Sequence, residues 1–514
     1  MNRIDAAAAA ALVEDGQTVV CAGFVGAGHA EAVSAAIERR FLASGKPSGL
    51  TLVYAAGQGD RANRGVNHFG HAGLVRRIVG GHWISAPKLG KLVRDDAVEA
   101  WNLPQGVITQ LYRAIAGGKA GVVTPIGLHT FVDPRHGGAR MTPRTQQSMV
   151  ELVTLGGREQ LFYPSFPVHV ALIRATTADT RGNLTTEHEP FHQDLLAIAQ
   201  AARNSGGTVI AQVKRIVEAG TLDPNLVRVP GILVDHLVVT EDPADHWMTF
   251  AEELNLDYTV AAPRERTVPP PAPLDLRRIV QRRAFLELQA LPGAVANLGV
   301  GMPAGIGAIA REAGHADFTL TLESGPVGGT PADKLSFGAS THPEAIIDHA
   351  AMFDFYDGGG LDIAFLGLAE FDPLGNVNVS RFGDVVAGIG GFINITQSTQ
   401  RLVFLGTLTA CGLQVASGDG RLRIVQEGRV KKLLPQVGQL SFNGPYVASL
   451  GRQVRYITER AVFDLRDGRL LLTEIAPGID LERDVLPALG APVAVADDLR
   501  TMDARVFTAG PLRG

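Results

Sequence analysis

Apolar and polar positions along the chain predict α/β domains. Short apolar runs end in glycine-rich turns and lead into helical patterns, as in TVVCAGFVGAGHAEAV from Thr18 to Val33. From Ala30 to Leu42 the apolar residues recur at every fourth position, and Gly45 and Pro47 end this predicted helix. A further helix is predicted from Asp275 to Leu291. Because apolar strands recur between helices, we expect mainly parallel sheets.

Three segments of the first half have counterparts, in the same order, in the second half. The clearest pair is VHVALIRATTADTRGNLT, from Val168, and LDIAFLGLAEFDPLGNVN, from Leu361. Each is an apolar strand with a D-x-x-G-N turn, in which glycine supplies a positive φ and Asx side chains cap the turn. The other pairs join strands to glycine turns: 18–33 with 293–310, and 49–60 with 317–329. We infer a pseudo-repeat of two similar open α/β domains, with the active site in the cleft between them.

A proline-rich segment separates the two halves. The sequence PRERTVPPPAPLD, from Pro263 to Asp275, disfavours both helix and strand pairing and is typical of an extended linker. We therefore place a boundary near residue 270, which gives predicted domains over residues 1–269 and 270–514.

Composition excludes several classes of protein. With 46% hydrophobic and 19% charged residues, the 514-residue chain is not a disordered polymer, and its net charge of −5 without a basic block does not favour nucleic acid. Its two cysteines, Cys21 and Cys411, are too few for a disulfide framework or an all-thiolate zinc site. The alanine run Ala6 to Ala11 is interpreted as a helix with Asp5 as N-cap and Gly16 as the C-terminal stop, and not as a signal peptide. We expect a cytoplasmic protein.

Two glycine turns follow predicted strands, GFVGAG from Gly23 to Gly28 and GVGMPAG from Gly299 to Gly305. Such a turn before a helix is able to bind a phosphate. The order of glycines differs from the dinucleotide fingerprint, and the acidic residue expected about 20 positions later is missing. A structural turn, an NAD(P) site and another anionic ligand all remain open for the first turn, and the second has the same ambiguity.

One carboxylate stands out at a strand end. In LTLESGPVGG, from Leu320, Glu323 follows an apolar strand, and ligands bind at the carboxyl ends of strands in open α/β sheets. The alternative is a glutamate that caps the turn or faces water. In NLPQG, Gln105 begins a predicted helix and offers a neutral amide donor, or else is a solvated loop residue.

Other candidate motifs are weaker. AGIGGF, from Ala387 to Phe392, offers backbone N–H groups for an oxyanion, or is a loop that needs positive φ. His68 and His71 lie three residues apart with no carboxylate close by in the sequence, so we expect structural hydrogen bonds there and no metal site. The motifs of serine hydrolases and of Walker A nucleotide sites are absent.

Together these segments resemble the family I coenzyme A transferases, most closely the single-chain acetate/propionate or 3-keto acid CoA-transferases with fused α and β halves. The resemblance covers essentially the whole chain. Its carriers include AGFVGAGHAE, AWNLPQGVI, NLGVGMPAGI, LTLESGPVGG and AGIGGFINI. The chain has Tyr54 and Ala55 where some 3-keto acid transferases carry asparagines, which fits the acetate/propionate branch better.

The resemblance implies a role for each candidate residue. Glu323 matches the glutamate nucleophile, and Gln105 matches a glutamine that helps to hold the carboxylate. Gly388 and Gly390 match a loop whose N–H groups face the thioester oxygen, and Gly299 and Gly301 match a turn beside CoA.

The expected reaction is CoA transfer between a short-chain acyl-CoA and a free carboxylate, with ping-pong kinetics through a glutamyl-CoA thioester. No cofactor or metal is expected, since CoA is a substrate, and the family implies a homo-oligomer. An unperturbed glutamate, with a pKa near 4.3, needs no base at pH 7. An acyl-CoA hydrolase, an NAD(P)-dependent oxidoreductase and a non-catalytic acyl-CoA sensor remain as alternatives.

Overall fold

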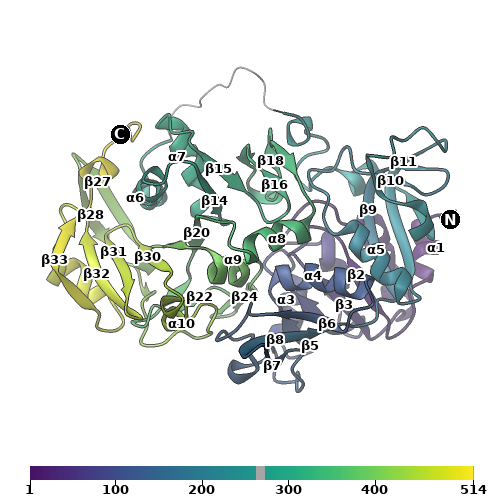
Figure 1. The fold of residues 1–514 in the computed structure, drawn as a ribbon, viewed down its shortest axis with the longest axis horizontal. Coiled ribbons are helices and arrows are strands. Elements are labelled where there is room, and N and C mark those ends of the chain that lie inside the picture. Colours follow the sequence, from purple (N-terminus) through teal and green to yellow (C-terminus); the bar gives the residue numbers. More distant parts are fainter. Residues whose placement is uncertain (262–271, 513–514) are drawn as a thin grey trace. The chain divides into compact units, whose positions relative to one another are not determined.

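A computed structural model describes residues 1–261 and 272–512 (Figure 1). The chain forms two compact units. Unit 1 comprises Met1–Ala262, Leu322–Asp354 and Gly383–Asn394, and unit 2 comprises Pro263–Thr321, Phe355–Phe382 and Ile395–Gly514. The predicted domain boundary near residue 270 lies outside the described residues. Among the described residues, no helix is both long and apolar enough to cross a membrane.

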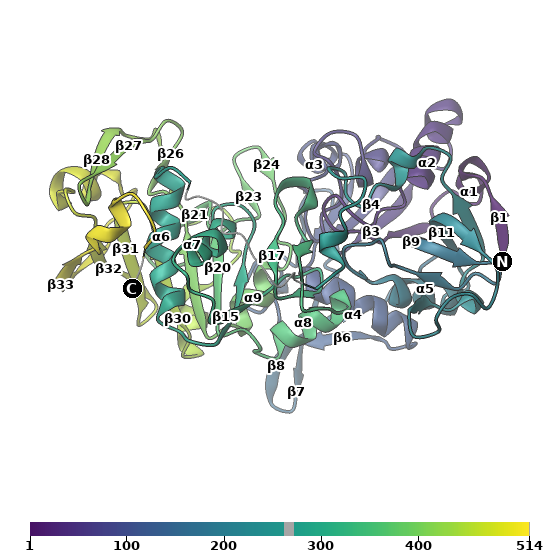
Figure 2. The ribbon, with the colours of Figure 1, turned by 90° about the horizontal axis from the view of Figure 1, so that it is seen from above.

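Unit 1 is built on a parallel sheet with helices on both faces. Helices α1 (Ala6–Ala11) and α2 (Glu31–Ser44) cover one face, and α4 (Gln105–Ala116) and α5 (Leu195–Asn204) cover the other (Figure 2). Neighbouring strands along the main path of the sheet are parallel. In spatial order these strands are β1 (Asn2–Ile4), β13 (His236–Val239), β11 (Thr208–Val217), β9 (Val170–Asp179), β2 (Thr18–Cys21), β3 (Leu50–Tyr54), β4 (Val75–Gly80) and β5 (Glu99–Asn102).

Unit 2 has a mixed sheet whose first strands are parallel, whose next two pairs are antiparallel and whose last pair is again parallel. Its helices include α6 (Leu276–Gln289), α7 (Ile306–Glu312) and α10 (Gly444–Ser449). The strands of this unit are, in spatial order, β15 (Phe318–Thr321), β14 (Ala294–Leu298), β20 (Ile363–Gly367), β25 (Arg401–Leu405), β30 (Gln453–Ile457), β31 (Ala461–Arg466), β32 (Arg469–Ile475) and β33 (Ala494–Thr501).

The two sheets share one strand order. In unit 1 the parallel run β13-β11-β9-β2-β3 corresponds to β30-β25-β20-β14-β15 in unit 2. The D-x-x-G-N turns after β9 and β20 also have matching hydrogen bonds. The Asp179 carboxylate accepts from the N–H and side-chain amide of Asn183, and Asp372 accepts the same two bonds from Asn376. These equivalences confirm the predicted pair of similar α/β domains with mainly parallel sheets.

Shorter elements surround the two sheets. Unit 1 also has helix α3 (Pro87–Arg94), and an antiparallel group of β6, β8 and β7. Helices α8 (His349–Asp357) and α9 (Phe392–Ser398) lie in the part of the chain where the assignment changes between units. The remaining short strands in unit 1 are β6 (Gly121–Thr124), β7 (Glu151–Leu155), β8 (Arg158–Pro164), β10 (Leu184–Thr185), β12 (Val227–Val229), β16 (Pro326–Val327), β17 (Thr330–Pro331), β18 (Ser340–Thr341), β19 (Ala345–Ile346) and β24 (Val385–Val386). Those in unit 2 are β21 (Glu370–Phe371), β22 (Val377–Asn378), β23 (Arg381–Phe382), β26 (Thr409–Ala410), β27 (Gln414–Gly418), β28 (Arg421–Gln426) and β29 (Val430–Lys431).

The predicted helices are present with small changes at their ends. Helix α2 ends at Gly45, which has the left-handed conformation expected of a C-terminal glycine. Asp5 caps α1 as predicted, because its carboxylate accepts a backbone N–H of the first turn. Asp275, predicted as the first residue of a helix, is instead the N-cap of α6. The end of α1 was wrong in the prediction: Leu12 is its C-cap, and Gly16 instead donates its N–H to Ser48 in the following loop.

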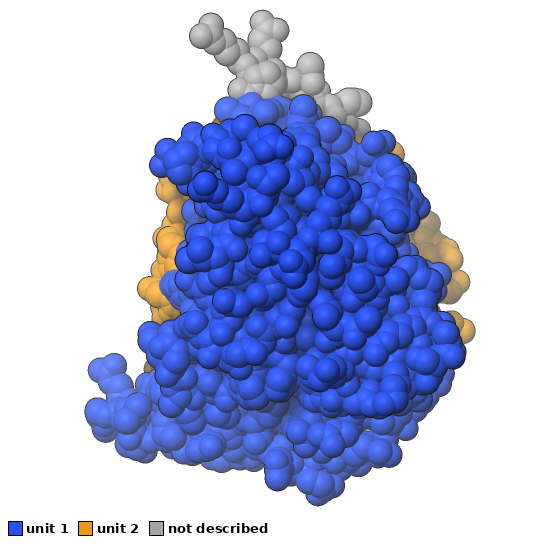
Figure 3. Space-filling model, turned by 90° about the vertical axis from the view of Figure 1, so that its right-hand side faces the viewer, with its two compact units in different colours: residues 1–262, 322–354, 383–394 blue, residues 263–321, 355–382, 395–514 orange. Residues whose placement is uncertain are grey.

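Two segments of the second half of the sequence belong to unit 1, namely 322–354 and 383–394 (Figure 3). They bring the LTLESGPVGG turn and the AGIGGF loop into the same compact unit as the first half of the chain. The candidate residues Glu323, Gln105, Gly388 and Gly390 are therefore all in unit 1, whereas Gly299 and Gly301 are in unit 2.

The first glycine turn, Gly23 to Gly28, is held by one hydrogen bond within the turn and one to Gly57. Val25 N–H donates to the Gly57 carbonyl over 2.6 Å, and Phe24 N–H donates to the Ala27 carbonyl over 2.9 Å. At the start of α2, the N–H of Ala32 donates to the side chain of Gln212. These bonds use donors that a dinucleotide phosphate needs, so they support the interpretation as a structural turn.

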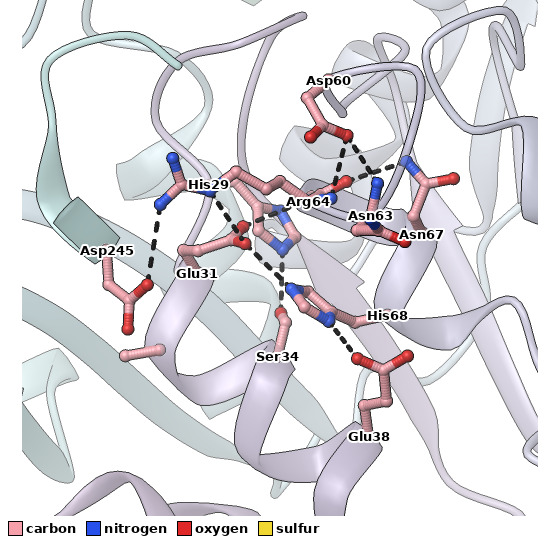
Figure 4. Close-up of polar contacts among 12 residues, drawn as sticks. His29, Glu31, Ser34, Glu38, Asp60, Asn63, Arg64, Asn67, His68 and Asp245 are labelled. Atoms are coloured by element: carbon pink, nitrogen blue, oxygen red, sulfur yellow. Dashed lines mark hydrogen bonds and ion pairs between the residues drawn. The ribbon is translucent and has the colours of Figure 1, made fainter. Parts of the chain in front are cut away.

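Beside this turn lies a buried network of charged side chains (Figure 4). His68 bonds Glu31 over 2.9 Å and Glu38 over 2.5 Å, and His71 bonds Glu38 over 2.6 Å. Burial lowers the pKa of His68, but its hydrogen bonds to the two carboxylates outweigh this effect and raise it. The predicted structural role of both histidines is confirmed, although α2 brings carboxylates that are distant in the sequence. Among the described residues, no group of three or more His, Cys, Asp or Glu side chains is arranged so that it could hold a metal ion.

We predict that His68→Ala destabilises the protein strongly, because the buried Glu31 loses its shortest charged contact and keeps only the Gly65 N–H and Arg64, whose Nε lies 3.4 Å away. Removing one member of a buried ion pair typically costs about 3–5 kcal/mol. His71→Ala is the matched control, since the His71 side chain is 25% exposed and bonds only Glu38. Thermal melting should show a large fall in melting temperature for His68→Ala and a small fall for His71→Ala. Equal falls in melting temperature would contradict the buried network as the source of stability.

Candidate active site

Glu323 lies in a tight turn directly after strand β15. The N–H of Leu322 donates to the Pro326 carbonyl over 3.0 Å, and the N–H of Gly325 donates to the Leu322 carbonyl over 3.0 Å. Gly325 has a φ of 124°, and a Cβ there would lie 2.0 Å from the carbonyl oxygen of Ile347. Only glycine fits this position, so the E-S-G sequence fixes the direction in which the Glu323 side chain leaves the turn.

The Glu323 carboxyl group packs against the backbone of the AGIGGF loop. A Cβ on Gly391 would lie 2.9 Å from Cδ of Glu323 and 3.0 Å from its Oε2. The side chain of Glu323 is half-buried, and it forms no salt bridge with any described lysine or arginine. Gly391 is thus the glycine that makes room for the carboxylate, a role that the sequence did not reveal.

The glycine loop is fastened to the end of β4 and to β5. The N–H of Gly390 donates to the Gly81 carbonyl over 2.8 Å, and Trp83 N–H donates to the Ala387 carbonyl over 2.7 Å. The buried amide of Asn102 accepts from Ile389 N–H over 2.8 Å and donates to the Gly81 carbonyl over 2.7 Å. The loop therefore has a fixed shape set by first-half residues.

These bonds distinguish the two glycines that were predicted to face an oxyanion. The N–H of Gly390 is already bonded to Gly81, which corrects its predicted role as a donor to substrate. The N–H of Gly388 makes no hydrogen bond to any described residue and remains a candidate donor. Gly388 also has a φ of 82°, and its Cβ would lie 2.8 Å from the Gly81 carbonyl oxygen, so glycine is required there as well.

Gln105 occupies the first position of α4, as predicted, but it is buried rather than a solvated loop residue. Its side chain is only 2% exposed. Its N–H donates to the Gly390 carbonyl over 2.9 Å, and its side-chain Nε2 lies 2.9 Å from Nε2 of His349. Gln105 therefore joins the glycine loop to the segment that carries Glu323.

The environment changes the acidity of Glu323. Burial raises its pKa to about 7, although a hydrogen bond from Gln105 acts in the opposite direction. The sequence-based expectation of a glutamate that is ionised at pH 7 applied to a carboxylate without special burial, and burial is the condition that this side chain does not meet. A carboxylate that is held by neutral donors and only partly desolvated keeps a high basicity, which favours nucleophilic attack.

The second glycine turn lies in unit 2, at the carboxyl end of β14. Gly299 donates its N–H to the Phe365 carbonyl over 2.8 Å. Gly301 is exposed, has a φ of 87°, and has no described atom within 4 Å of the place that a Cβ would take. The predicted contact of this turn with CoA stays a prediction.

Sequence reasoning missed four residues of this site: Gly391, Asn102, His349 and Asp194. Asn102 was part of the quoted NLPQG motif, and Gly391 was part of AGIGGF. Nothing in the sequence of either motif distinguished these two residues from their neighbours. His349 and Asp194 are far apart in the sequence and meet only in the folded unit, where Asp194 Oδ2 lies 2.8 Å from His349 Nδ1. Tyr54 and Ala55, which replace the asparagines of some 3-keto acid transferases in the sequence comparison, are buried in unit 1.

Comparisons with known proteins define the class of protein to which this fold belongs. Residues 3–240 match the family model described as "Coenzyme A transferase". Over 512 residues, 98% of this chain and 97% of the relative, the sequence is 44% identical to a caffeate CoA-transferase of Acetobacterium woodii. The chain belongs to the coenzyme A transferases, as a single-chain member of family I, and is an enzyme that transfers CoA between an acyl-CoA and a carboxylate.

Two further comparisons place the chain within this class. It is 40% identical to the acetate CoA-transferase YdiF of Escherichia coli (strain K12), over 96% of this chain and 92% of the relative. Its structure matches the crystal structure of the acyl-CoA transferase YdiF from E. coli O157:H7 in a thioester complex with CoA. That match has a TM-score of 0.93 and 39% identity, and covers 99% of this chain and 96% of the other.

We predict that Gly391→Ala lowers kcat/KM by about 10²-fold, because its methyl group would displace the Glu323 carboxyl by roughly 1 Å. Gly418→Ala is the control, since Gly418 has an ordinary φ and open space around its Cβ position. Steady-state kinetics and thermal melting should show lost activity in a folded protein. Full activity of Gly391→Ala would mean that the carboxyl does not react from this position.

Proposed function

We propose that this enzyme transfers CoA through a covalent glutamyl-CoA thioester on Glu323. The observation that carries the proposal is the enclosure of one carboxylate, at a strand end, between the Gln105 amide and the glycine backbone at 388–391. Among the described residues this carboxylate has no lysine or arginine partner that would neutralise it. The thioester complex reported for the acyl-CoA transferase of E. coli O157:H7 supports the proposal.

The proposed first half-reaction begins with attack of the ionised Glu323 on the thioester carbonyl of acyl-CoA. The CoA thiolate leaves, and an acyl-glutamyl anhydride forms. The thiolate then attacks the glutamyl carbonyl, which releases the donor as a free carboxylate and leaves CoA on Glu323. An acceptor carboxylate repeats these steps in reverse and leaves as the new acyl-CoA. Every bond that forms replaces one that breaks, so no proton, metal or redox partner is needed.

Each addition step creates an oxyanion that requires hydrogen-bond donors. The unpaired N–H of Gly388 and the amide of Gln105 are the proposed donors, and a single such donor typically contributes about 10²–10³ in rate. The anhydride and the thioester are both sensitive to water, so partial enclosure of Glu323 favours transfer over hydrolysis. Gly299 and Gly301 are proposed to contact CoA, whose binding energy is then available at the reacting carbonyl.

The proposed substrates are short-chain acyl-CoA thioesters and carboxylates of the acetate, propionate or 3-keto acid class. The 40% identity to an acetate CoA-transferase supports this choice. Because the chain is 44% identical to a caffeate CoA-transferase, an aromatic acid should be the first carboxylate tested beside these short-chain acceptors. We further propose that the enzyme uses no cofactor, acts as a homo-oligomer in the cytoplasm, and serves short-chain fatty acid or ketone body metabolism.

Incubation with an acyl-CoA and no acceptor should leave CoA attached to Glu323, because the second half-reaction lacks its carboxylate. Intact-protein and peptide mass spectrometry measure the adduct, and borohydride should reduce the thioester and inactivate the enzyme. Glu323→Gln and Glu323→Ala should lose the adduct and the transfer activity. An adduct on another residue, such as Glu370, would contradict the assignment.

The same variants carry their own folding control. The pKa of Glu323 is higher in the folded protein than in the unfolded chain, so ionising this side chain opposes folding. The free energy of unfolding therefore falls as the pH rises from the pKa of the unfolded chain to the folded pKa of about 7. Above pH 7 the Glu323→Gln variant should therefore melt at a higher temperature than the wild type. Lost activity together with unchanged or higher stability separates a chemical role from misfolding.

The pH dependence of the first half-reaction should report the raised pKa of Glu323. Only the carboxylate attacks, so kcat/KM for acyl-CoA should rise with pH through about 7 and level off above it. Measurement from about pH 5.5 to 8.5 at saturating acceptor tests this expectation. A flat profile over that range would mean that Glu323 keeps an ordinary pKa, near 4.3, in the working enzyme.

A further inference from the structure

A buried line of three side chains ends at Gln105. The Asp194 carboxylate lies 2.8 Å from Nδ1 of His349, and Nε2 of His349 lies 2.9 Å from the side-chain nitrogen of Gln105. The three side chains are at most 6% exposed. They come from three separate places in unit 1, the starts of helices α5, α8 and α4.

Hydrogen-bond chemistry fixes the direction of every proton in this line. A carboxylate only accepts, so Nδ1 of His349 carries the proton that Asp194 receives. An amide nitrogen only donates, so Nε2 of His349 has no proton and accepts one from Gln105. The arrangement therefore requires the Nδ1–H tautomer of a neutral imidazole, and this tautomer accepts the amide only when the nitrogen of Gln105 faces it.

The surroundings hold the imidazole in place. The N–H of His349 lies 3.3 Å from the Gln193 carbonyl that it donates to, and the rings of Phe24 and Phe353 flank the imidazole at centroid distances of 5.8 and 5.4 Å. Although Asp194 is the N-cap residue of α5, its side chain makes no capping hydrogen bond. The Asp194 carboxylate thus bonds His349 instead of capping the helix. The apolar rings around the imidazole strengthen this hydrogen bond because they lower the local dielectric constant.

We propose that His349, oriented by Asp194, is a positioning residue that locks the amide of Gln105 with its NH₂ group toward Glu323. This inference rests on the proposed function, in which Glu323 is the nucleophile. A glutamine amide that is free to rotate presents its oxygen or its nitrogen at nearly equal cost. Its oxygen would repel the Glu323 carboxylate and the oxyanion that follows, whereas its nitrogen stabilises both. Acceptance of one amide proton by His349 leaves the second for Glu323, whose hydrogen bond with Gln105 lowers its pKa.

The experiment measures the rate at which the glutamyl-CoA adduct forms, by rapid-quench mass spectrometry, in His349→Phe and Asp194→Asn. Phenylalanine keeps the ring but removes the acceptor. Asparagine keeps the shape of Asp194 but weakens the orienting bond: its oxygen offers Nδ1–H a neutral acceptor in place of a charged one, and its NH₂ group, if it faces Nδ1, moves the imidazole proton to Nε2, where it opposes the Gln105 nitrogen. Both variants should slow the adduct by about 10–10³-fold, the scale of one lost donor, with little change in KM for acyl-CoA. His349→Gln, which places an amide oxygen near the position of Nε2, should recover much of the rate.

A double-mutant cycle separates positioning from a merely structural role. If His349 acts only through Gln105, then Gln105→Ala and Gln105→Ala/His349→Phe should react at the same rate. Additive losses would overturn the inference, and so would a wild-type adduct rate in His349→Phe or Asp194→Asn. If His349→Phe does not fold, the near-isosteric Asp194→Asn and the rescue variant decide the question. Failure of the proposed function is distinguishable, because the wild-type adduct itself would then be absent from Glu323.

Discussion

The candidate active site is organised around an unfavourable interaction, the enclosure of the Glu323 carboxylate without a lysine or arginine partner among the described residues. Burial raises its pKa to about 7, whereas the Gln105 amide lowers it. A guanidinium at this position would hold the charge firmly and also weaken the carboxylate as a nucleophile. Neutral donors stabilise the charge less, so the carboxylate keeps the basicity that covalent transfer needs.

Most of the surrounding structure serves to place backbone, rather than side chains, against this carboxylate. Gly391 has no room for a Cβ because Glu323 occupies that space, and Gly325 has none because the Ile347 carbonyl does. Asn102 spans the gap between the glycine loop and the end of β4 with hydrogen bonds to Ile389 and Gly81. The shape of the site therefore depends on close backbone approaches, which resist motion because no side-chain rotation relieves them.

Local patterns were sufficient to predict the strands, the glycine turns, the capped helices and the strand-end position of Glu323. Each of these features is set by residues that are neighbours in the sequence. The pairing of His349 with Asp194 is not, because it joins positions 155 residues apart, and neither is the contact of Gly391 with Glu323. The same limit explains the histidines: His68 meets Glu31 and Glu38 only after α2 packs beside it, and the raised pKa of Glu323 likewise arises only from tertiary burial.

The pseudo-repeat shows how one local pattern takes two roles. After β2, the Gly23–Gly28 turn is closed. The Gln58 side chain lies 2.9 Å from the Cβ position of Gly23, and the side chain of Gln212 accepts the Ala32 N–H in the first turn of α2. After the equivalent strand β14, the turn at Gly301 is open, exposed, and free of described atoms within 4 Å of its Cβ position. Glycine is required in the first turn mainly by packing and in the second by its positive φ. The open turn has an exposed surface, which is the property that the proposed CoA contact requires. The closed turn has no such surface, because its side of the backbone packs within the unit that holds Glu323.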